Sequence, residues 1–379
     1  MAEAIFWITI VIIIYTYFGY PIVTFLLSLF IHNPVDQKDI DPKVTFLITA
    51  YNEEKNIGKK LENTLSLDYP RDKLEVIVAS DGSTDRTDEI VKTFEDRGVY
   101  LHRVEGRVGK TETQNKAVVV SKGEVVIFSD ATTDYSQEAI RKIVRNYNDP
   151  TVGAVSGRYE YVNPTGAPVG QGTILFWKYE NFLKSRQTRI KTITGCCGCI
   201  YSVRRDLYEP LPRDIISDLV EPLKIIEKGY RIAFEPEAVA FELTEDAVSD
   251  EFSMRIRVIT RAMKGLSYVK TLLNPLKYPF ESYQLNSHKV ARWLIPFFLI
   301  ILFLCNAMLL DGWFYLFIFL LQIIFYGSAL YAWKMENSGK TVGALSIPLF
   351  FCVINLASLR AAFNHIRRKK MTTWETVRK

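Results

Sequence analysis

Acidic and amide side chains gather at three points where short apolar runs end, and they are the residues of this chain best suited to chemistry. One point is Asp130, directly after VVIFS, and the others are the clusters TAYNEE at 49–54 and SDGSTD at 80–85. Carboxylates accept hydrogen bonds from N–H and O–H donors and bind hard cations. The clusters therefore predict one shared site for an anionic nucleotide, a metal ion or sugar hydroxyls, although their side chains would also suit helix caps.

Alternating elements must bring these clusters together. Apolar runs at 44–50, 74–80 and 125–129 alternate with amphipathic stretches at about 54–66 and 84–96. This order is typical of a parallel β-sheet with crossover helices. Ligands of such sheets bind beyond the carboxyl ends of the strands, where the clusters stand. We therefore predict an α/β domain with Asp130 at the mouth of its sheet.

Composition separates a globular middle from two apolar ends. Of the 379 residues, 48% are hydrophobic and 13% aromatic, and the formal net charge is +5. No basic run interleaved with aromatic residues occurs in the middle, which argues against a nucleic acid partner and favours a lipid surface as the partner of the surplus cations. The cysteines predict no disulfide framework, and the CCGC run at 196–199 is interpreted as a tight loop of small residues rather than a soft-metal site.

The N-terminal apolar stretch is long enough to cross a bilayer. Residues 4–31 carry no charge, whereas a span takes about 20 apolar residues. The stretch is too long for a secretory signal and lacks its cleavage site, so we predict a retained helix, kinked at 19–21. Lys38 and Lys43 follow it, and the positive-inside rule then places the next part of the chain in the cytoplasm.

The C-terminal third predicts interface and membrane helices. Residues 251–286 are basic and amphipathic, which suits a helix at the membrane surface or one covering the sheet. Residues 293–310 and 313–333 are nearly free of charge and predict a transmembrane hairpin. A third apolar stretch, 342–363, would place the basic tail outside if it spans. A re-entrant or interfacial course, which we favour, keeps the tail in the cytoplasm.

Six motifs together resemble the membrane-integrated inverting glycosyltransferases of family 2, the group of cellulose, chitin, hyaluronan and poly-N-acetylglucosamine synthases. In chain order they are TAYNEE, ASDGSTD, GKTETQN, FSDATTDY, TGCCGCIYSVRR and SDLVEPLKIIEKGYR. The resemblance covers residues 40–265 and implies a GT-A fold, which is a Rossmann-like α/β domain for nucleotide-diphospho-sugars. It also implies a UDP-sugar donor, Mg²⁺ or Mn²⁺, and transfer that inverts the anomeric carbon.

The resemblance assigns donor-binding residues. It implies that the UDP-sugar is bound by Ala50, Tyr51, Glu53, Asp81, Lys110 and Asp130. Asp130 would bind the metal ion and Lys110 would lie near the phosphates, where its charge offsets the diphosphate. The family commonly has a second Asp two places after the first, and this chain has Thr132 there, with the next carboxylate at Asp134. The metal affinity and any part played by Asp134 stay open.

Asp218 is the expected general base. Inverting transfer needs a carboxylate across the site from the metal, to take the proton of the attacking hydroxyl. The family supplies it from an ED or DD pair, and here the pair is Ser217 and Asp218. A helix cap is the structural alternative for Asp218.

Acceptor and tail residues follow from the same resemblance. Gly195 and Gly198 would let the backbone approach the acceptor, and Arg257 and Arg261 would meet a diphosphate or a lipid phosphate. The Trp that processive members carry on the interface helix is missing from 253–265, which argues against a long polymer held by stacking. The tail residues expected to fold over the nucleotide, with disorder as the alternative, are Trp374, Thr376 and Arg378.

We therefore expect a multi-pass enzyme of the plasma membrane with a cytoplasmic catalytic domain. Its expected parts are a transmembrane helix at 1–35, the GT-A domain at 40–250, interface helices at 251–290, membrane segments at 291–364 and a basic tail at 365–379. Its expected reaction moves a hexose from a UDP-sugar to a saccharide or lipid-linked acceptor with a β-linkage. A processive synthase that secretes its polymer, a catalytically silent nucleotide-binding scaffold and a nucleotidyltransferase are the alternatives.

Overall fold

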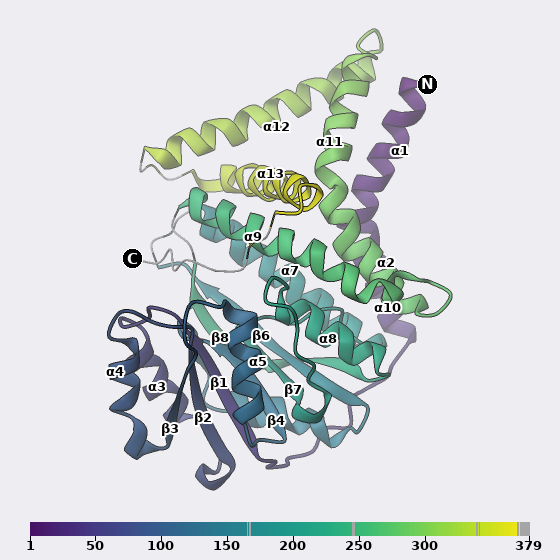
Figure 1. The fold of residues 1–379 in the computed structure, drawn as a ribbon. Helices are drawn as coiled ribbons and strands as arrows, with labels where there is room; N and C mark the ends of the chain where they lie inside the picture. The colour runs from purple at the N-terminus through teal and green to yellow at the C-terminus, as the bar shows by residue number, and fades with distance from the viewer. Residues whose placement is uncertain are drawn as a thin grey trace.

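An eight-stranded sheet forms the middle of the molecule (Figure 1). The structure is a computed structural model and describes residues 1–164, 166, 168–244, 247–338, 340, 342–369 and 371. The strand order is β3-β2-β1-β4-β7-β6-β8-β5. The strands are β1 (Val44–Ala50), β2 (Leu74–Ser80), β3 (Val99–Arg103), β4 (Val125–Asp130), β5 (Asp134–Tyr135), β6 (Val152–Val162), β7 (Ile200–Arg204) and β8 (Arg231–Leu243).

The sheet is mixed, so the prediction of a parallel sheet is right for only part of it. Strands β3, β2, β1 and β4 run parallel, whereas β7 runs antiparallel to both β4 and β6. Ser129, near the carboxyl end of β4, pairs with Ile200, the first residue of β7. Strand β7 therefore begins at the edge of the sheet where β4 ends, and it runs back across the sheet antiparallel to β4.

Helices cover both faces of the sheet and explain its uninterrupted apolar strands. Phe46 and Ile48 of β1 belong to one buried cluster and Leu47 to the cluster on the other face. A strand buried on both faces carries no polar alternation. The helices beside the sheet are α3 (Ile57–Ser66), α4 (Thr87–Lys92), α5 (Lys110–Val120), α6 (Ala139–Val144), α7 (Pro168–Ile190) and α8 (Ser217–Glu227).

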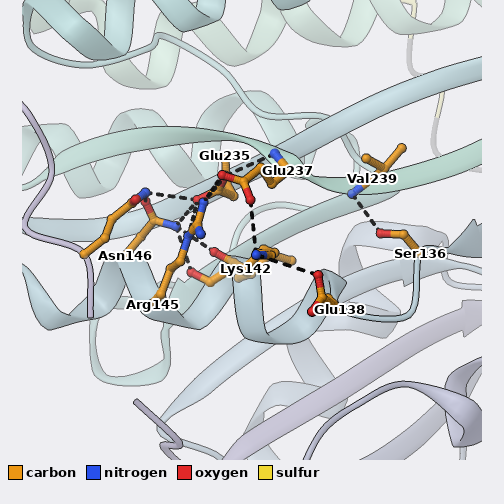
Figure 2. Close-up of polar contacts among 10 residues, drawn as sticks. Ser136, Glu138, Lys142, Arg145, Asn146, Glu235, Glu237 and Val239 are labelled. Carbon is orange, nitrogen blue, oxygen red and sulfur yellow. Dashed lines mark hydrogen bonds and ion pairs between the residues drawn. The ribbon is translucent and has the colours of Figure 1, made fainter. Parts of the chain in front are cut away.

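A buried carboxylate fastens β8 to the 3-10 turn Arg145–Asn148, which follows α6, and to the chain after the N-terminal helix (Figure 2). Glu235 is fully buried and accepts hydrogen bonds at 3.0 Å from Arg145 Nε, Arg145 Nη2, Asn146 Nδ2 and Gln37 Nε2. Glu237 beside it accepts from Arg145 at 2.6 Å and pairs with Lys142 at 3.1 Å. This network fixes the second half of the sheet against both its covering helix and the linker.

Four helices in the described part of the chain are long and apolar enough to cross a membrane. They are Ala2–Phe30, Pro279–Ala307, Trp313–Asn337 and Gly343–Ile366. The first consists of α1 (Ala2–Ile14) and α2 (Tyr20–Phe30), joined by a π-helical turn at Tyr15–Gly19 directly before Tyr20 and Pro21, where the sequence predicted a kink. The others contain α10 (Pro279–Gln284), α11 (Ala291–Ala307), α12 (Trp313–Asn337) and α13 (Ser346–Ile366).

These helices rise from one side of the sheet (Figure 1). The amphipathic helix α9 (Val248–Leu266) lies between the sheet and α13, which packs along it. The far end holds the N-terminus and the α11–α12 connection, since the Tyr315 hydroxyl donates to Glu3 Oε1 at 2.6 Å.

Candidate active site

One large cavity joins the carboxyl edge of the sheet to the apolar helices. Its volume is about 1730 Å³. Residues at the ends of β1 and β4, the loop before β7 and the start of α8 line one half, and residues of α1, α11, α12 and α13 line the other. A ligand pocket usually measures about 300–1,000 Å³, so this cavity has room for more than one ligand.

The loops after β1 and β2 hold each other in place. The Asn52 amide N–H donates to Ser83 Oγ at 3.2 Å, and Asn52 Oδ1 accepts from the Thr84 N–H at 2.8 Å. The Glu53 N–H donates to Thr87 Oγ1 at 2.7 Å. The helices α3 and α4 begin three residues later than the sequence pattern indicated. Asn52 and Ser83 act between the two loops, whereas Asp85 Oδ1 accepts from the N–H of Thr87, the first residue of α4, at 3.0 Å. Glu53 itself lines the cavity.

Asp81 fixes the loop that leads into α5. This fully buried carboxylate accepts from the Val108 N–H at 2.8 Å, the Gly109 N–H at 3.0 Å and Thr113 Oγ1 at 3.0 Å. It does not line the cavity. The next residue, Gly82, has φ +67°, and an added Cβ would lie 2.6 Å from the Gly106 carbonyl oxygen, so only glycine fits this turn.

Lys110 and Asp130 form an ion pair inside the cavity. Lys110 opens α5 and Asp130 ends β4, and the Lys110 ammonium donates to Asp130 Oδ1 and, at 3.4 Å, to the Gly198 carbonyl. Burial alone would lower the pKa of Lys110, but the Asp130 carboxylate outweighs it and the pKa lies above its usual value. The ammonium is thus a fixed positive charge beside Asp130.

The residues around Asp130 fit a divalent cation shared with a substrate. No group of three His, Cys, Asp or Glu side chains in the described residues is arranged to hold a metal. Mg²⁺ and Mn²⁺ need no such cage, because one or two carboxylates plus substrate phosphates suffice. Asp134 lies outside the cavity and pairs with Lys59, while Thr132 donates to Glu242 Oε1 at 2.6 Å. Asp130 and Glu242 are therefore the carboxylates that line the cavity here.

A buried lysine supports the loop after Asp130. Lys60 is 1% exposed, and its ammonium donates to the Thr133 carbonyl at 2.7 Å and lies 4.2 Å from the centre of the Tyr135 ring. Burial lowers the pKa of Lys60 to about 7, with Asp134 and Asp130 among the charges that oppose this shift. This role could not be predicted from the sequence, since Lys60 lies in an amphipathic stretch where a lysine normally faces water.

Asp218 stands at the start of α8 and faces the loop of cysteines and glycines. An added Cβ at Gly198 would lie 2.9 Å from Asp218 Oδ2, and the Cys196 N–H donates to the Asp218 carbonyl at 2.9 Å. Ser217, which replaces the acid of the family pair, donates instead to Gln114 Oε1 at 2.7 Å. Burial, and after it the Asp130 charge, raise the pKa of Asp218 against the opposing influence of Lys110.

The CCGC run lines the cavity as a tight loop. Cys197 donates its N–H to Ser156 Oγ at 3.2 Å, and the Cys199 carbonyl accepts from the Tyr135 hydroxyl at 2.7 Å. All three cysteines are free thiols, and the Cys197 and Cys199 sulfur atoms lie 3.4 Å apart. Gly195, at φ +151°, also lines the cavity.

The two arginines of α9 line the cavity in different ways. The Arg261 guanidinium is 8% exposed and donates to Thr111 Oγ1 at 3.0 Å and to the Ile215 carbonyl. Burial lowers the pKa of Arg261 to about 10, so the group stays charged at neutral pH. Arg261 thus ties α9 to α5 and to the segment before Asp218, whereas Arg257 is half-buried at the cavity wall.

Most of the residues predicted from the sequence meet in this cavity. Those that line it are Glu53, Lys110, Asp130, Gly195, Gly198, Asp218, Arg257 and Arg261. Ala50, at the end of β1, and Tyr51 and Asp81, in the loops that follow β1 and β2, do not line it, and the Arg107 guanidinium lies 4.1 Å from the Tyr51 ring centre. The predicted tail residues Trp374, Thr376 and Arg378 lie outside the described residues.

The sequence pattern missed a polar group deeper in the cavity. Glu180 and Lys184 of α7 and His288, Lys289 and Arg292, at and just before the start of α11, all line it. Charged residues close to an apolar span often mark a functional site, so Lys289 and Arg292 could have been identified from the sequence. Glu180 could not, because its helix showed no motif.

The fold and this cavity define a class of protein. The mixed sheet, with a carboxylate after β4 and another at α8 on one cavity, is a GT-A fold, and residues 45–211 match the model "Glycosyl transferase family 2". The chain therefore contains a glycosyltransferase family 2 domain, which confirms the resemblance and the fold class predicted from the sequence.

The chain is similar in sequence to two named bacterial proteins. The chain is 28% identical over 271 residues to the probable glycosyltransferase YdaM of Bacillus subtilis, covering 68% of this chain and 62% of that protein. It is 27% identical over 221 residues to the poly-beta-1,6-N-acetyl-D-glucosamine synthase of Staphylococcus aureus (strain COL), covering 56% and 53%. These alignments thus span under two thirds of the relatives' length.

A solved structure resembles nearly the whole chain. The mannosyltransferase PcManGT from Pyrobaculum calidifontis, solved in complex with GDP-Man and Mn²⁺, matches with a TM-score of 0.72 and 23% identity, over 98% of this chain and 100% of that one. At this identity the likeness shows the fold, including the arrangement of the apolar helices around the sheet.

Proposed function

We propose that this chain is a membrane-bound inverting glycosyltransferase that moves a hexose from a UDP-sugar to a saccharide or glycolipid acceptor, forming a β-linkage. The observation that carries the proposal is that two carboxylates, Asp130 and Asp218, line one cavity. The Lys110 ammonium donates a hydrogen bond to Asp130 and is attracted by the charge of Asp218. In this reaction the carboxylate that holds the metal ion and the carboxylate that acts as general base must both face the donor.

The proposed roles follow from the positions of these groups. Asp218 takes the proton of the acceptor hydroxyl as its oxygen attacks the anomeric carbon, and the bond from that carbon to the diphosphate oxygen breaks on the opposite face. Lys110 offsets the charge that develops on the departing nucleoside diphosphate. A divalent cation held at Asp130 would supply further positive charge to the diphosphate. Glu53 and the loop fixed by Asp81 would bind the nucleoside.

Nucleotide release by the detergent-purified chain tests this proposal. The assay measures UDP or GDP formed with Mg²⁺ or Mn²⁺ from a panel of UDP-sugars and GDP-mannose, with and without membrane lipid extract. We expect one donor to give metal-dependent release that the lipid stimulates and that Asp218→Asn lowers by about 10³-fold or more.

The Asp218→Asn variant also separates chemistry from folding. Because the folded state raises the pKa of Asp218, its ionised form costs stability at pH values above its unfolded-state pKa. The neutral variant should therefore melt no lower than the parent. Pyrophosphate release would favour a nucleotidyltransferase, and full activity of the variant would refute the assignment of the base.

A further inference from the structure

A cationic cluster lies where the cavity passes from the sheet edge to the apolar helices. Its members are Glu180, Lys184, His288, Lys289 and Arg292. Glu180 Oε1 accepts from Arg292 Nη1 at 2.6 Å and lies 3.0 Å from His288 Nε2. The Glu180 and His288 side chains are 6% and 4% exposed, so the centre of the cluster is buried at the cavity wall. The roles proposed above for donor and base use none of these residues.

The cluster has more positive than negative charge. Three cations, Lys184, Lys289 and Arg292, accompany the single carboxylate Glu180, and only Arg292 pairs with it among the described residues. The Lys184 ammonium lies 5.4 Å from the Trp177 ring centre and makes no ion pair with a described carboxylate. Arg292 Nε is buried without a hydrogen-bond partner among them. Buried cations are costly unless an anion meets them, so the cluster is suited to an anionic ligand.

An apolar chamber continues from this cluster between the candidate membrane helices. We define it by residues of α11, α12, α13 and the N-terminal helix, namely Tyr17, Phe18, Leu299, Leu302, Leu321, Phe325, Ile347, Phe351 and Ile354. Phe18, Leu321 and Ile347 are 65%, 46% and 57% exposed, so the chamber opens sideways through the outer surface of the helices. A molecule already in the bilayer can enter it there.

We propose that the acceptor is a lipid whose headgroup begins with a phosphate, with this phosphate in the cationic cluster and the apolar chain in the chamber. The inference rests on the proposed function for the reaction, but binding of such a lipid does not depend on turnover. Lys289 and Asp218 line the same cavity, so an acceptor bound by its phosphate in the cluster has room to reach toward Asp218.

The walls of the chamber favour a hydrocarbon chain over a growing polysaccharide. Sugar hydroxyls need hydrogen-bond partners when water is removed, and leaving them unpaired is costly. The chamber offers mainly aliphatic and aromatic side chains, with few polar partners such as Gln322 and Asn355 nearby. A lipid chain makes no such demand, and each CH₂ group that it buries is favourably removed from water.

Equilibrium binding to the full-length protein, without any nucleotide sugar, tests the inference. The probes are phytanyl monophosphate, its uncharged alcohol phytanol, and inorganic phosphate. We expect phytanyl monophosphate to bind at least about 10-fold more tightly than either of the others, since charge and chain both contribute. Equal binding of inorganic phosphate would indicate a free anion site, and equal binding of phytanol an apolar pocket without an anion site. Either result overturns the proposal.

Two pairs of variants locate the site. Lys289→Gln should weaken phytanyl monophosphate binding about 10-fold or more, whereas Lys277→Gln, which removes an exposed cation outside the cavity, should not. Leu321→Trp should obstruct the chamber, whereas Leu320→Trp, at an exposed neighbouring position that does not line it, should bind like the parent.

Failure of this inference and failure of the proposed function give different results. If phytanyl monophosphate binds in a Lys289-dependent way and no donor is turned over, the lipid site stands and the transferase proposal fails. If a donor is turned over but both control variants weaken binding as much as their partners, the lipid assignment fails alone. Melting curves of all four variants identify any that has lost its fold.

Discussion

At the scale of single residues, the site depends on charges held close together with little water. Asp218 is half-buried, and its neighbours include one carboxylate, Asp130, and two cations, Lys110 and Arg261. Burial raises the pKa of Asp218, the Asp130 charge adds to that increase, and the cations reduce it. A base with a raised pKa is a stronger proton acceptor, provided that it is still ionised at the working pH.

The pH profile of transfer should report this balance. The base works only when ionised, so kcat/KM should fall as the pH decreases through the pKa of Asp218, at pH values where an ordinary Asp, with a pKa of about 3.9, is still ionised. In Lys110→Met the fall should begin at higher pH, because the largest influence that lowers this pKa is removed. Rates measured from pH 4 to 9 in overlapping buffers would show it. A profile that does not move in the variant would contradict the assignment.

At the scale of elements, loops position the site and buried polar contacts position the loops. Asp81 fixes the turn before α5, Lys60 supports the turn after β4, and Arg261 joins α9 to the segment before α8. Each of these side chains is at most 8% exposed. A residue that a motif marks as ligand-binding can thus act indirectly, by holding in position the residues that line the cavity.

The Glu235 network predicts unequal costs for its two cations (Figure 2). Arg145→Ala would leave the buried Glu235 carboxylate without its cation, and we expect a loss of about 3–5 kcal/mol of stability. Lys142→Ala removes a partner of Glu237, which is 56% exposed, so it should cost at most about 1 kcal/mol.

Thermal melting of the two purified variants beside the parent measures the difference. Equal melting temperatures for both variants would show that the buried pair of Arg145 and Glu235 does not fasten β8 to the turn after α6. A lower value for Lys142→Ala than for Arg145→Ala would also contradict the expectation.

At the scale of the whole molecule, the apolar helices hold the sheet at one end and the turn between α11 and α12 at the other (Figure 1). The N-terminus and the 308–312 turn lie together at the end away from the catalytic sheet, fastened by Tyr315 and Glu3 (Figure 1). If the sheet faces the cytoplasm, as the sequence predicts, this end lies outside the cell. The helix α13 packs along α9 and also against α11 and α12, so its interfacial course stays a prediction.

Cysteine labelling of intact cells tests this orientation. Asp311→Cys, in the exposed far turn, should react with a membrane-impermeant maleimide from outside, whereas Lys38→Cys, exposed between α2 and β1, should react only after the cells are opened. The parent, with its five free thiols, gives the background. Labelling of Lys38→Cys in intact cells would invert the orientation.

The sequence by itself determined the domain type, the edge at which the site lies and eight of the residues that line the cavity. Strand ends and motifs are local, so the positions of Asp130, Lys110 and Asp218 can be inferred from neighbours along the chain. Antiparallel β7, the Lys60 support and the cationic cluster could not be inferred, because each depends on contacts between segments far apart in sequence. Lys60 meets Thr133 across 73 positions and Glu180 meets Arg292 across 112. Only the tertiary structure decides which distant charges share one buried space, and here it joined the catalytic edge to an apolar chamber.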